Sequence, residues 1–408
     1  MINAGPPQGA NAFLEGQELT REETPLEVSS FKQGPRDWLC QTAGAAAPSG
    51  LEPAAPSLLE QARTGYRNEA SGERRPARHR ALHEVNNRGG KSLKVQRRPV
   101  HGVLLLDKPI GLSSNQALQK AKWLLRADKA GHTGTLDPLA TGVLPLCFGA
   151  ATKFSQIQLD ADKTYEAVLL LGLKTTTGDA EGDVIETRPV PEITPELLEK
   201  LTKQFTGPIA QIPPMYSALK KDGKALYEYA RKGEEVEREA RNIVIYELNM
   251  ALAVDKRMQA AIKIIVKCSK GTYIRTLGED IGEAIGCGAH LVSLRRIETG
   301  GYLAAQCISL LDLEALDEAG RDARLLPPQS LVASYPTVTL DADNAGRFLS
   351  GLRRRGTPGQ WGKDAPLVQV FGSDPIAFLG SAHITADELI PQRLLSPIEV
   401  QDMLQAAH

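Results

Sequence analysis

The spacing of apolar and polar residues along the 408-residue chain becomes regular only after about residue 98. Short apolar runs and runs with alternating apolar positions predict strands; these cover 103–106, 163–172 and 260–268. Helical spacing follows a residue that can cap a first turn, either Ser113 or Ser114 in one case and Thr194 in another. The predicted helices cover 115–126, 194–205 and a segment that opens at Tyr273.

The last part of the chain has a different pattern. A linker is predicted at 325–336, followed by short strands within 336–341, 366–372 and 376–382 that are separated by Gly and Asp turns. This pattern predicts a small, mostly β domain. Because strands and helices mix without a regular βαβ alternation, the predicted fold class is α+β with a mixed sheet.

Residues 1–98 are rich in Ala, Pro, Gly, Arg and Glu and keep no regular period. Such a composition buries too little apolar surface to offset the entropy of ordering, so we predict a disordered extension. Basic residues dominate its second part, 63–98. A second interpretation is therefore a basic arm that adds non-specific attraction to phosphates.

The whole-chain composition excludes several classes of protein. An apolar share of 42% and a charged share of 24% are globular values, and the net charge of −1 favours no particular partner. The five cysteines form no C-x-x-C pair, so we expect reduced thiols, no metal site and no cofactor. No apolar run is long enough for a membrane span and no signal peptide begins the chain, so a cytoplasmic protein is expected.

The stretch "GHTGTLDPLATGVL", 131–144, contains one carboxylate, Asp137. Asp followed by Pro138 is a typical helix start, with the aspartate as cap. Alternatively, Gly131 and Gly134 let the backbone approach a ligand, and Asp137 is a nucleophile or base without a competing carboxylate nearby. The two interpretations are compatible, because helix starts favour anions.

The segment 207–237 is too apolar for a free loop and too irregular for a helix. Lysines alternate there with tyrosines, a pattern that suits phosphate contact combined with base stacking. The candidate RNA-binding residues are Tyr216, Lys220, Lys221 and Lys224.

Five segments carry a family resemblance. They read "HGVLLLDKPIGLSS", "GHTGTLDPLATGVLPLCFGAATK", "KTYEAVLLLG", "PPMYSALKKDGKALYEYARKG" and "KGTYIRTLGEDIG". In this order they resemble the bacterial members of the TruB family of pseudouridine synthases, densely over 101–296 and more loosely beyond. The resemblance implies an isomerase that converts uridine to pseudouridine at position 55 in the T-loop of tRNA, by flipping the base out of the stack.

The resemblance also implies roles for individual residues. Asp137 corresponds to the nucleophile, and Arg275 to the arginine that pairs with it. His132 corresponds to the residue that fills the gap left by the flipped base. Tyr165 corresponds to the tyrosine that stacks on uracil and moves a proton. The remaining candidates for substrate binding are Tyr273, Leu294 and Lys108.

Several of these residues also have an ordinary structural interpretation. Tyr165, Tyr273 and Leu294 fit apolar faces and would be core residues on pattern alone. Arg275 lies four residues before Glu279, the spacing of a helix-surface ion pair. His132 would be a turn residue bonded to the backbone.

The implied organisation has three parts. We expect the extension over 1–98, a catalytic domain over 99–331 with an RNA-embracing segment at about 207–237, and a PUA-like RNA-binding domain over 332–408. The arginine run in "GLRRRGTPG", 351–359, is either a solvated surface or a tRNA contact. The expected partner is the T-arm stem-loop of tRNA, bound by a monomer without guide RNA.

Two alternatives remain at this point. The chain could be an RNA-binding or tRNA-folding factor whose benefit is independent of catalysis. It could also be a guide-RNA-dependent relative, although the residues of the 137–153 motif and the long 207–237 segment are of bacterial type.

Overall fold

The computed structural model describes residues 96–255 and 258–406. The predicted N-terminal extension lies outside the described residues except for its last three positions. There Arg98 forms an isolated β-bridge with Ala127, and its guanidinium contacts the carboxylates of Glu318 and Asp322. None of the helices in the described ranges combines the length and apolar character of a bilayer-spanning segment.

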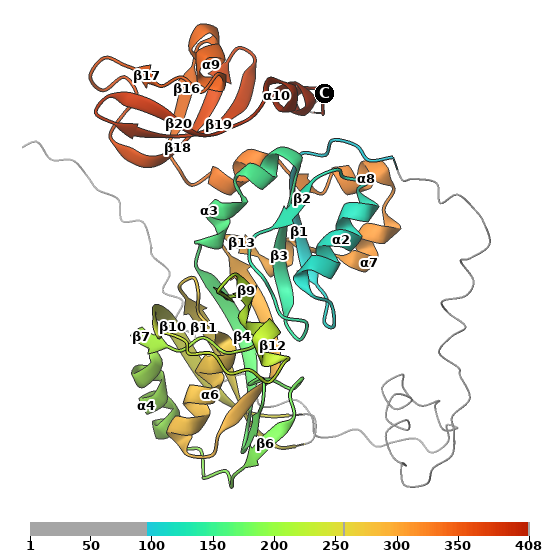
Figure 1. The fold of residues 1–408 in the computed structure, drawn as a ribbon, viewed down its shortest axis with the longest axis vertical. Coiled ribbons are helices and arrows are strands. Elements are labelled where there is room, and N and C mark those ends of the chain that lie inside the picture. The colour runs from blue at the N-terminus through green and yellow to red at the C-terminus, as the bar shows by residue number, and fades with distance from the viewer. Residues whose placement is uncertain (1–95, 256–257, 407–408) are drawn as a thin grey trace, which may run out of the picture. The chain divides into compact units, whose positions relative to one another are not determined.

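A large mixed sheet forms the first part of the fold (Figure 1). Among the described residues it has 11 strands, and its main path runs β14-β1-β3-β12-β4-β11-β10-β7. These strands are β14 (Ile308–Ser309), β1 (Gly102–Lys108), β3 (Thr141–Phe148), β12 (Ala289–Thr299), β4 (Lys163–Leu171), β11 (Ala260–Cys268), β10 (Arg241–Val254) and β7 (Gly207–Gln211). β2 (Ala130–His132), β13 (Tyr302–Leu303) and β15 (Leu325–Leu326) pair beside this path. Only β1–β14 and β3–β12 pair in parallel in this sheet of the described chain, so it is mainly antiparallel.

Three amphipathic helices share one hydrophobic core with this sheet. They are α2 (Ser114–Leu124), α4 (Pro195–Phe205) and α6 (Ile274–Ile285). Each contributes apolar side chains at helical spacing to the same cluster, as Leu277 and Ile281 do from α6. Figure 1 shows α2 beside β1 and β3, and α6 and α4 beside the other half of the sheet. The smaller helices of this part are α3 (Ser155–Leu159), α7 (Leu310–Ala315) and α8 (Glu318–Asp322).

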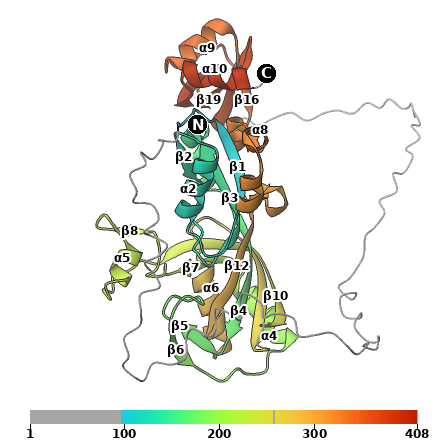
Figure 2. The ribbon, with the colours of Figure 1, turned by 90° about the vertical axis from the view of Figure 1, so that its right-hand side faces the viewer.

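Two short hairpins extend from the large sheet. One joins β5 (Leu173–Thr175) to β6 (Val184–Thr187), and the other joins β8 (Lys220–Lys221) to β9 (Lys224–Ala225). The second hairpin continues into α5 (Leu226–Ala230). Figure 2 shows β8 and α5 standing away from the strands of the large sheet.

A second sheet follows near the C-terminus, in the order β16-β18-β19-β20-β17. Its strands are β16 (Thr337–Leu340), β18 (Ala365–Ser373), β19 (Ile376–Thr385), β20 (Glu388–Leu394) and β17 (Arg354–Arg355). With α9 (Ala342–Leu349) it encloses its own core around Phe348 and Trp361, and α10 (Pro397–Ala406) ends the described chain. The predicted small β domain is therefore confirmed.

Most predicted elements of the first part are confirmed. Ser113 caps α2 through a capping box with Gln116, and Thr194 caps α4. Tyr273 lies immediately before α6. The predicted inward face of β4 is buried, with Tyr165, Ala167, Leu169 and Leu171 among the core residues.

Two predictions are wrong. No helix follows Asp137: the chain makes a turn in which the Ala140 N–H donates to the Asp137 carbonyl at 3.0 Å, and then enters β3. The helix fails because 141–148 is an apolar run that completes the sheet between β1 and β12. The segment 325–336 is no free linker either, since Leu331 and Val332 are buried in a core that also contains Phe378 of β19.

Candidate active site

The loop that carries Asp137 lies between β2 and β3 and is held from two sides. The Leu136 N–H donates to Ser114 Oγ at 2.7 Å, and the Ser114 hydroxyl donates to the Leu136 carbonyl at 3.0 Å. The Gly111 N–H donates to the Pro138 carbonyl at 2.8 Å. The start of α2 and the turn before it therefore fix the backbone on both sides of Asp137.

Gly142 fixes the far end of this loop, where β3 begins. Its φ of +101° lies in the left-handed region that favours glycine. A Cβ there would lie 2.1 Å from the Arg296 carbonyl oxygen, because β3 and β12 are paired at this position. Gly134 also has a positive φ, whereas Gly131 has neither a positive φ nor a neighbour within 4 Å of a built Cβ.

The Asp137 carboxylate binds the guanidinium of Arg275, with Oδ2 3.0 Å from Nη2. The Arg275 side chain is 6% exposed and that of Asp137 is 40% exposed, so the pair is buried on the protein side and open at the carboxylate. Nη1 of Arg275 also donates to the Thr177 carbonyl at 3.1 Å, and Nη2 to the Tyr216 carbonyl at 2.6 Å. The structure therefore brings Asp137 and Arg275 together as predicted, and Arg275 does not form the helix-surface pair with Glu279.

Asp179 is a second acidic residue of this network. Its side chain is 4% exposed and Oδ2 lies 3.7 Å from Nη1 of Arg275. The Thr177 hydroxyl and the Glu181 N–H both donate to Asp179 Oδ1, at 2.5 Å and 3.0 Å. Asp179 is not among the site residues predicted from the sequence. A signal was present, since Thr-x-Asp and Asp-x-Glu spacings favour local turns of this kind.

Burial raises the pKa of Asp137 above its ordinary value. The nearby Arg275 guanidinium opposes this rise, Asp179 adds to it, and Lys108 opposes it. Arg275 thus lowers the cost of ionising a partly desolvated carboxylate.

Lys108 lies behind the loop and has no exposed surface. Its ammonium group donates to the carbonyls of Pro109 at 2.8 Å, Leu112, and Pro138 at 3.5 Å. Burial lowers the pKa of Lys108 to about 8, while Asp137 opposes the shift. In this arrangement Lys108 joins the turn after β1 to the Asp137 loop, and its predicted substrate contact stays a prediction.

Tyr165 and Leu294 lie on the adjacent strands β4 and β12, where Leu294 is opposite Ala167 and Tyr165 is opposite Arg296; Tyr165 and Leu294 are each 8% exposed in the same core as α6. Burial raises the pKa of Tyr165, and the charge of Arg296, the residue opposite it on β12, opposes this rise. Asp137 is close enough to Tyr165 to affect the same pKa. The core interpretation of both residues is therefore correct as to burial, and their contact with uracil stays a prediction.

His132 and Tyr273 stand at the ends of elements. His132 is the last residue of β2, and burial lowers the pKa of its imidazole, with the Arg296 charge adding to the effect. Tyr273 precedes α6 and exchanges two backbone bonds with the Gln211 side chain, at 2.8 Å and 3.0 Å. Gln211 of β7 thereby sets the position from which Arg275 reaches Asp137.

Arg296 was missed by the sequence interpretation. It lies on β12, is 1% exposed, and donates from Nε to the Val143 carbonyl at 2.8 Å and from Nη2 to the Gly134 carbonyl at 3.5 Å. No local pattern identifies it, because two adjacent arginines in a strand cannot be assigned to the core or the surface without the register.

The predicted RNA-binding residues lie around the β8–β9 hairpin. Lys220, Lys221 and Lys224 are exposed, and the Lys221 ammonium donates to the Glu237 carbonyl at 2.7 Å. Tyr216 precedes the hairpin, and its carbonyl accepts from Arg275 as described above. The hairpin is therefore connected through one hydrogen bond to the residue that holds Asp137.

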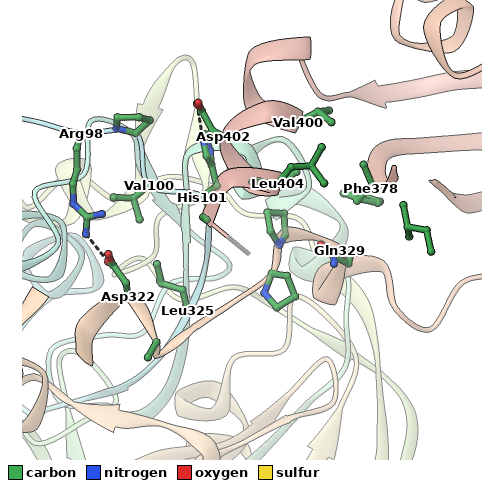
Figure 3. A pocket seen from close by; sticks show the side chains of 18 residues that line it. Arg98, Val100, His101, Asp322, Leu325, Gln329, Phe378, Val400, Asp402 and Leu404 are labelled. Carbon is green, nitrogen blue, oxygen red and sulfur yellow. Dashed lines mark hydrogen bonds and ion pairs between the residues drawn. The ribbon is translucent and has the colours of Figure 1, made fainter. Parts of the chain in front are cut away.

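A cavity of about 510 Å³ lies away from these residues. Figure 3 shows it between the 98–101 and 322–329 segments and side chains of β19 and α10, with His101 and Asp402 pointing toward one another. His101 Nδ1 accepts from the Ala150 N–H at 3.0 Å, and Nε2 lies 3.3 Å from Asp402 Oδ2. None of the predicted site residues lines this cavity.

The arginine run near the C-terminus is partly engaged within the protein. Arg353 and Arg355 both form ion pairs with Glu388, at 3.3 Å and 2.9 Å, and Arg354 donates to Asn344 at 2.8 Å. A tRNA contact of this run stays a prediction. In the described ranges, no group of three or more His, Cys, Asp and Glu side chains lies together as metal ligands would.

The loop contributes the half-exposed carboxylate of Asp137, α6 contributes the buried guanidinium of Arg275, and β4 contributes the buried phenol of Tyr165. The three groups lie over the same hydrophobic core. Such an arrangement can present an ionised nucleophile to a flat, uncharged ring that enters from solvent.

Comparison with known proteins supports the same site. Residues 122–274 match the family model described as TruB family pseudouridylate synthase (N terminal domain). Residues 275–333 match the one described as tRNA pseudouridylate synthase B C-terminal domain. The chain is 64% identical over 313 residues to tRNA pseudouridine synthase B of Verminephrobacter eiseniae, which covers 76% of this chain and 93% of that protein. It is 54% identical over 305 residues to the protein of the same name in Cupriavidus pinatubonensis, covering 74% and 96%.

Solved structures agree in fold at lower identity. A chain of a Cbf5-Nop10-Gar1 complex matches with a TM-score of 0.54 and 23% identity, covering 75% of this chain and 87% of that one. A chain of an H/ACA RNP bound to a substrate RNA containing 2'-deoxyuridine matches with a TM-score of 0.53 and 23% identity, covering 73% and 86%. With two family models over 122–333 and relatives more than half identical over most of their length, this chain belongs to the TruB family of pseudouridine synthases.

Proposed function

We propose that this chain converts uridine 55 in the T-loop of tRNA to pseudouridine, with Asp137 as the nucleophile. The reaction class follows from family membership: the chain is an isomerase that forms pseudouridine from uridine in tRNA. The position in tRNA and the roles of individual residues are the further content of the proposal.

One observation carries the assignment of Asp137. Its carboxylate is 40% exposed, yet it is held at 3.0 Å by an arginine that is 6% exposed. Here the buried partner orients the carboxylate and the open side leaves room for a substrate atom.

The chemistry requires only groups that this pocket has. The bond between N1 of uracil and C1' of ribose breaks, a bond between C5 and C1' forms, and one proton moves from C5 to N1. Asp137 attacks the nucleoside, Arg275 keeps it ionised, and Tyr165 stacks on the ring and takes part in the proton transfer. Leu294 keeps water from the reacting face, and His132 fills the place of the flipped base.

RNA binding is assigned to the surface around the β8–β9 hairpin. Exposed lysines at 220, 221 and 224 supply phosphate contacts, and Tyr216 supplies an aromatic face. We further propose that the enzyme acts as a monomer in the cytoplasm without guide RNA. The names of its relatives, tRNA pseudouridine synthase B, support tRNA as the substrate. The similarity to chains from H/ACA complexes is a similarity of fold alone, and it gives no reason to propose a guide RNA for this protein.

The test uses a T-arm hairpin RNA and the variant Asp137→Asn. We expect this variant to bind the hairpin with unchanged affinity and to form no pseudouridine, because the amide is not a nucleophile. Asp160→Asn is the matched control, since Asp160 is 58% exposed in a surface pair with Lys270 at 2.9 Å. Pseudouridine formation by Asp137→Asn would refute the catalytic assignment. Activity of the wild type only with an added guide RNA would refute the guide-free proposal.

A further inference from the structure

Arg296 is a buried cation that the proposed mechanism does not use. Strand alternation directs Arg295 and Arg296 to opposite faces of β12. Arg295 forms a two-point ion pair with Asp107, at 3.0 Å and 2.8 Å, on the more exposed face. Arg296 extends into the protein, where 1% of it remains exposed.

The partners of Arg296 are neutral. Its guanidinium donates to the carbonyls of Val143 and Gly134. On the neighbouring strand β4, the residue directly opposite Arg296 is Tyr165, and side chains at such opposite positions lie on the same face of the sheet. Within 96–255 and 258–406, the ion pairs of β12 include Arg295 with Asp107 but none of Arg296. Burying a guanidinium without a carboxylate is expensive, and an apolar side chain of similar volume would pack there at lower cost. Residues that break a packing rule in this way concentrate at functional sites.

Arg296 connects the parts of the pocket that must stay in register. The Val143 carbonyl belongs to β3, the Gly134 carbonyl belongs to the loop before Asp137, and Tyr165, which lies opposite Arg296, belongs to β4. The ionisable groups that interact with Arg296 or Tyr165 are Asp137 from the loop, His132 from β2, Lys163 from β4, Cys268 from β11 and Cys307, which precedes β14. Among these, Arg296 is the residue directly opposite Tyr165 in the paired strands, and its charge has the largest effect on the phenol.

We propose that Arg296 is a positioning residue that acts through Tyr165: it fixes the phenol oxygen in the pocket and stabilises negative charge on it while a proton passes. The inference rests on the proposed function. Isomerisation moves one proton from C5 to N1 of the same uracil, with no net gain or loss. A phenol that gives up its own proton and receives the other carries negative charge in between, and a fixed cation on the adjacent strand stabilises that state.

The experiment compares Arg296→Lys and Arg296→Gln with wild type in single-turnover reactions on the T-arm hairpin. We expect Arg296→Gln to lower the rate of pseudouridine formation by roughly 100-fold, as removal of a charge-stabilising donor does. Arg296→Lys keeps the charge and should recover part of that loss. The hairpin dissociation constant should stay within about threefold for both variants. Arg295→Lys is the matched control on the opposite face of the strand and should react like wild type.

Two readouts separate positioning from a merely structural role. In a Tyr165→Phe background, Arg296→Lys should change the rate by less than about twofold, because the group through which it acts is gone. With Tyr165 in place, Arg296→Gln should shift the rise of the rate to higher pH, since the charge that opposes the burial of the phenol is removed. Where Tyr165→Phe reacts too slowly to compare, the pH profile decides.

Three results would overturn the inference. They are an equal loss with Tyr165 in place and in the Tyr165→Phe background, an unshifted pH profile, or a wild-type rate in Arg296→Gln. Should Arg296→Gln fail to fold, Arg296→Lys carries the same comparisons. If wild type itself forms no pseudouridine in the hairpin, the proposed function fails and not the relation between Arg296 and Tyr165.

Discussion

Gly142 is the position where a single methyl group should damage both the fold and the Asp137 loop. Alanine at φ +101° costs about 1–3 kcal/mol in backbone strain. Its Cβ would lie 2.1 Å from the Arg296 carbonyl oxygen, well inside contact distance, so β3 and β12 must separate. That movement weakens the 2.8 Å bond from Arg296 to the Val143 carbonyl, which adds about 1–3 kcal/mol. We expect Gly142→Ala to lose about 2–5 kcal/mol of unfolding free energy.

The comparison is Gly131→Ala, at the other end of the same loop. Gly131 has no positive φ and no atom within 4 Å of a built Cβ, so its stability should change by less than about 0.5 kcal/mol. Thermal unfolding should place Gly142→Ala roughly 5–15 °C below wild type and Gly131→Ala close to it. The activity of Gly131→Ala also reports whether bound RNA occupies the open space into which the added methyl group points.

Activity gives the second half of the test. Because Asp137 lies in the loop that ends at Gly142, pseudouridine formation per folded molecule should also fall, by roughly tenfold or more. Equal unfolding temperatures for Gly142→Ala and Gly131→Ala would refute the reasoning about the β3–β12 contact. A destabilised Gly142→Ala with a wild-type single-turnover rate would show that the loop holds Asp137 independently of this strand pair.

Other predictions concern charge. Since burial raises the pKa of Asp137, the single-turnover rate should fall on acidification at a pH above the ordinary aspartate value, and a midpoint at or below that value would contradict the burial argument. The same raised pKa means that the folded protein loses stability as pH rises through it, so Asp137→Asn should unfold at pH 7 no earlier than wild type. Lys153→Ala removes a 2.5 Å ion pair with the mostly buried Glu399 and should cost about 1–3 kcal/mol by denaturant unfolding, with no loss meaning that the pair is solvated. Affinity for the T-arm hairpin should fall steeply as the salt concentration rises. Replacing the three exposed lysines Lys220, Lys221 and Lys224 should reduce the slope of the logarithm of the binding constant against the logarithm of salt concentration by up to about 2–3.

Local pattern predicted the elements whose periodicity and caps agree. The helix α2 with its Ser113 cap and the strand β4 with its buried face are examples, because each is specified within about a dozen residues. The strand β3 was not found, since its glycine and proline weaken the strand signal and Asp137-Pro138 favours a helix start. There the sheet, completed by residues far along the chain, overrides the local preference.

The residues of the candidate site likewise fall into those that the sequence predicted and those that it did not. Asp137, Arg275 and Tyr165 were identified through family motifs, since each has an ordinary structural interpretation alone. Asp179 and Arg296 were not, because their meaning depends on which residues face them. Asp179 becomes significant only when the β5–β6 connection reaches Arg275, and Arg296 only when β12 is placed beside β3 and β4.

The two contacts of Arg275 Nη2 have a consequence for how the enzyme selects among tRNA substrates. One atom contacts Asp137 at 3.0 Å and the Tyr216 carbonyl at 2.6 Å, so Asp137 and the segment leading to the β8–β9 hairpin share a donor. By reciprocity, an RNA that shifts this segment changes the energy of the carboxylate, and the state of the carboxylate changes the affinity for that RNA. Discrimination between tRNAs can then arise after binding: a poorly fitting RNA occupies the enzyme, leaves the shared donor misplaced, and dissociates unmodified.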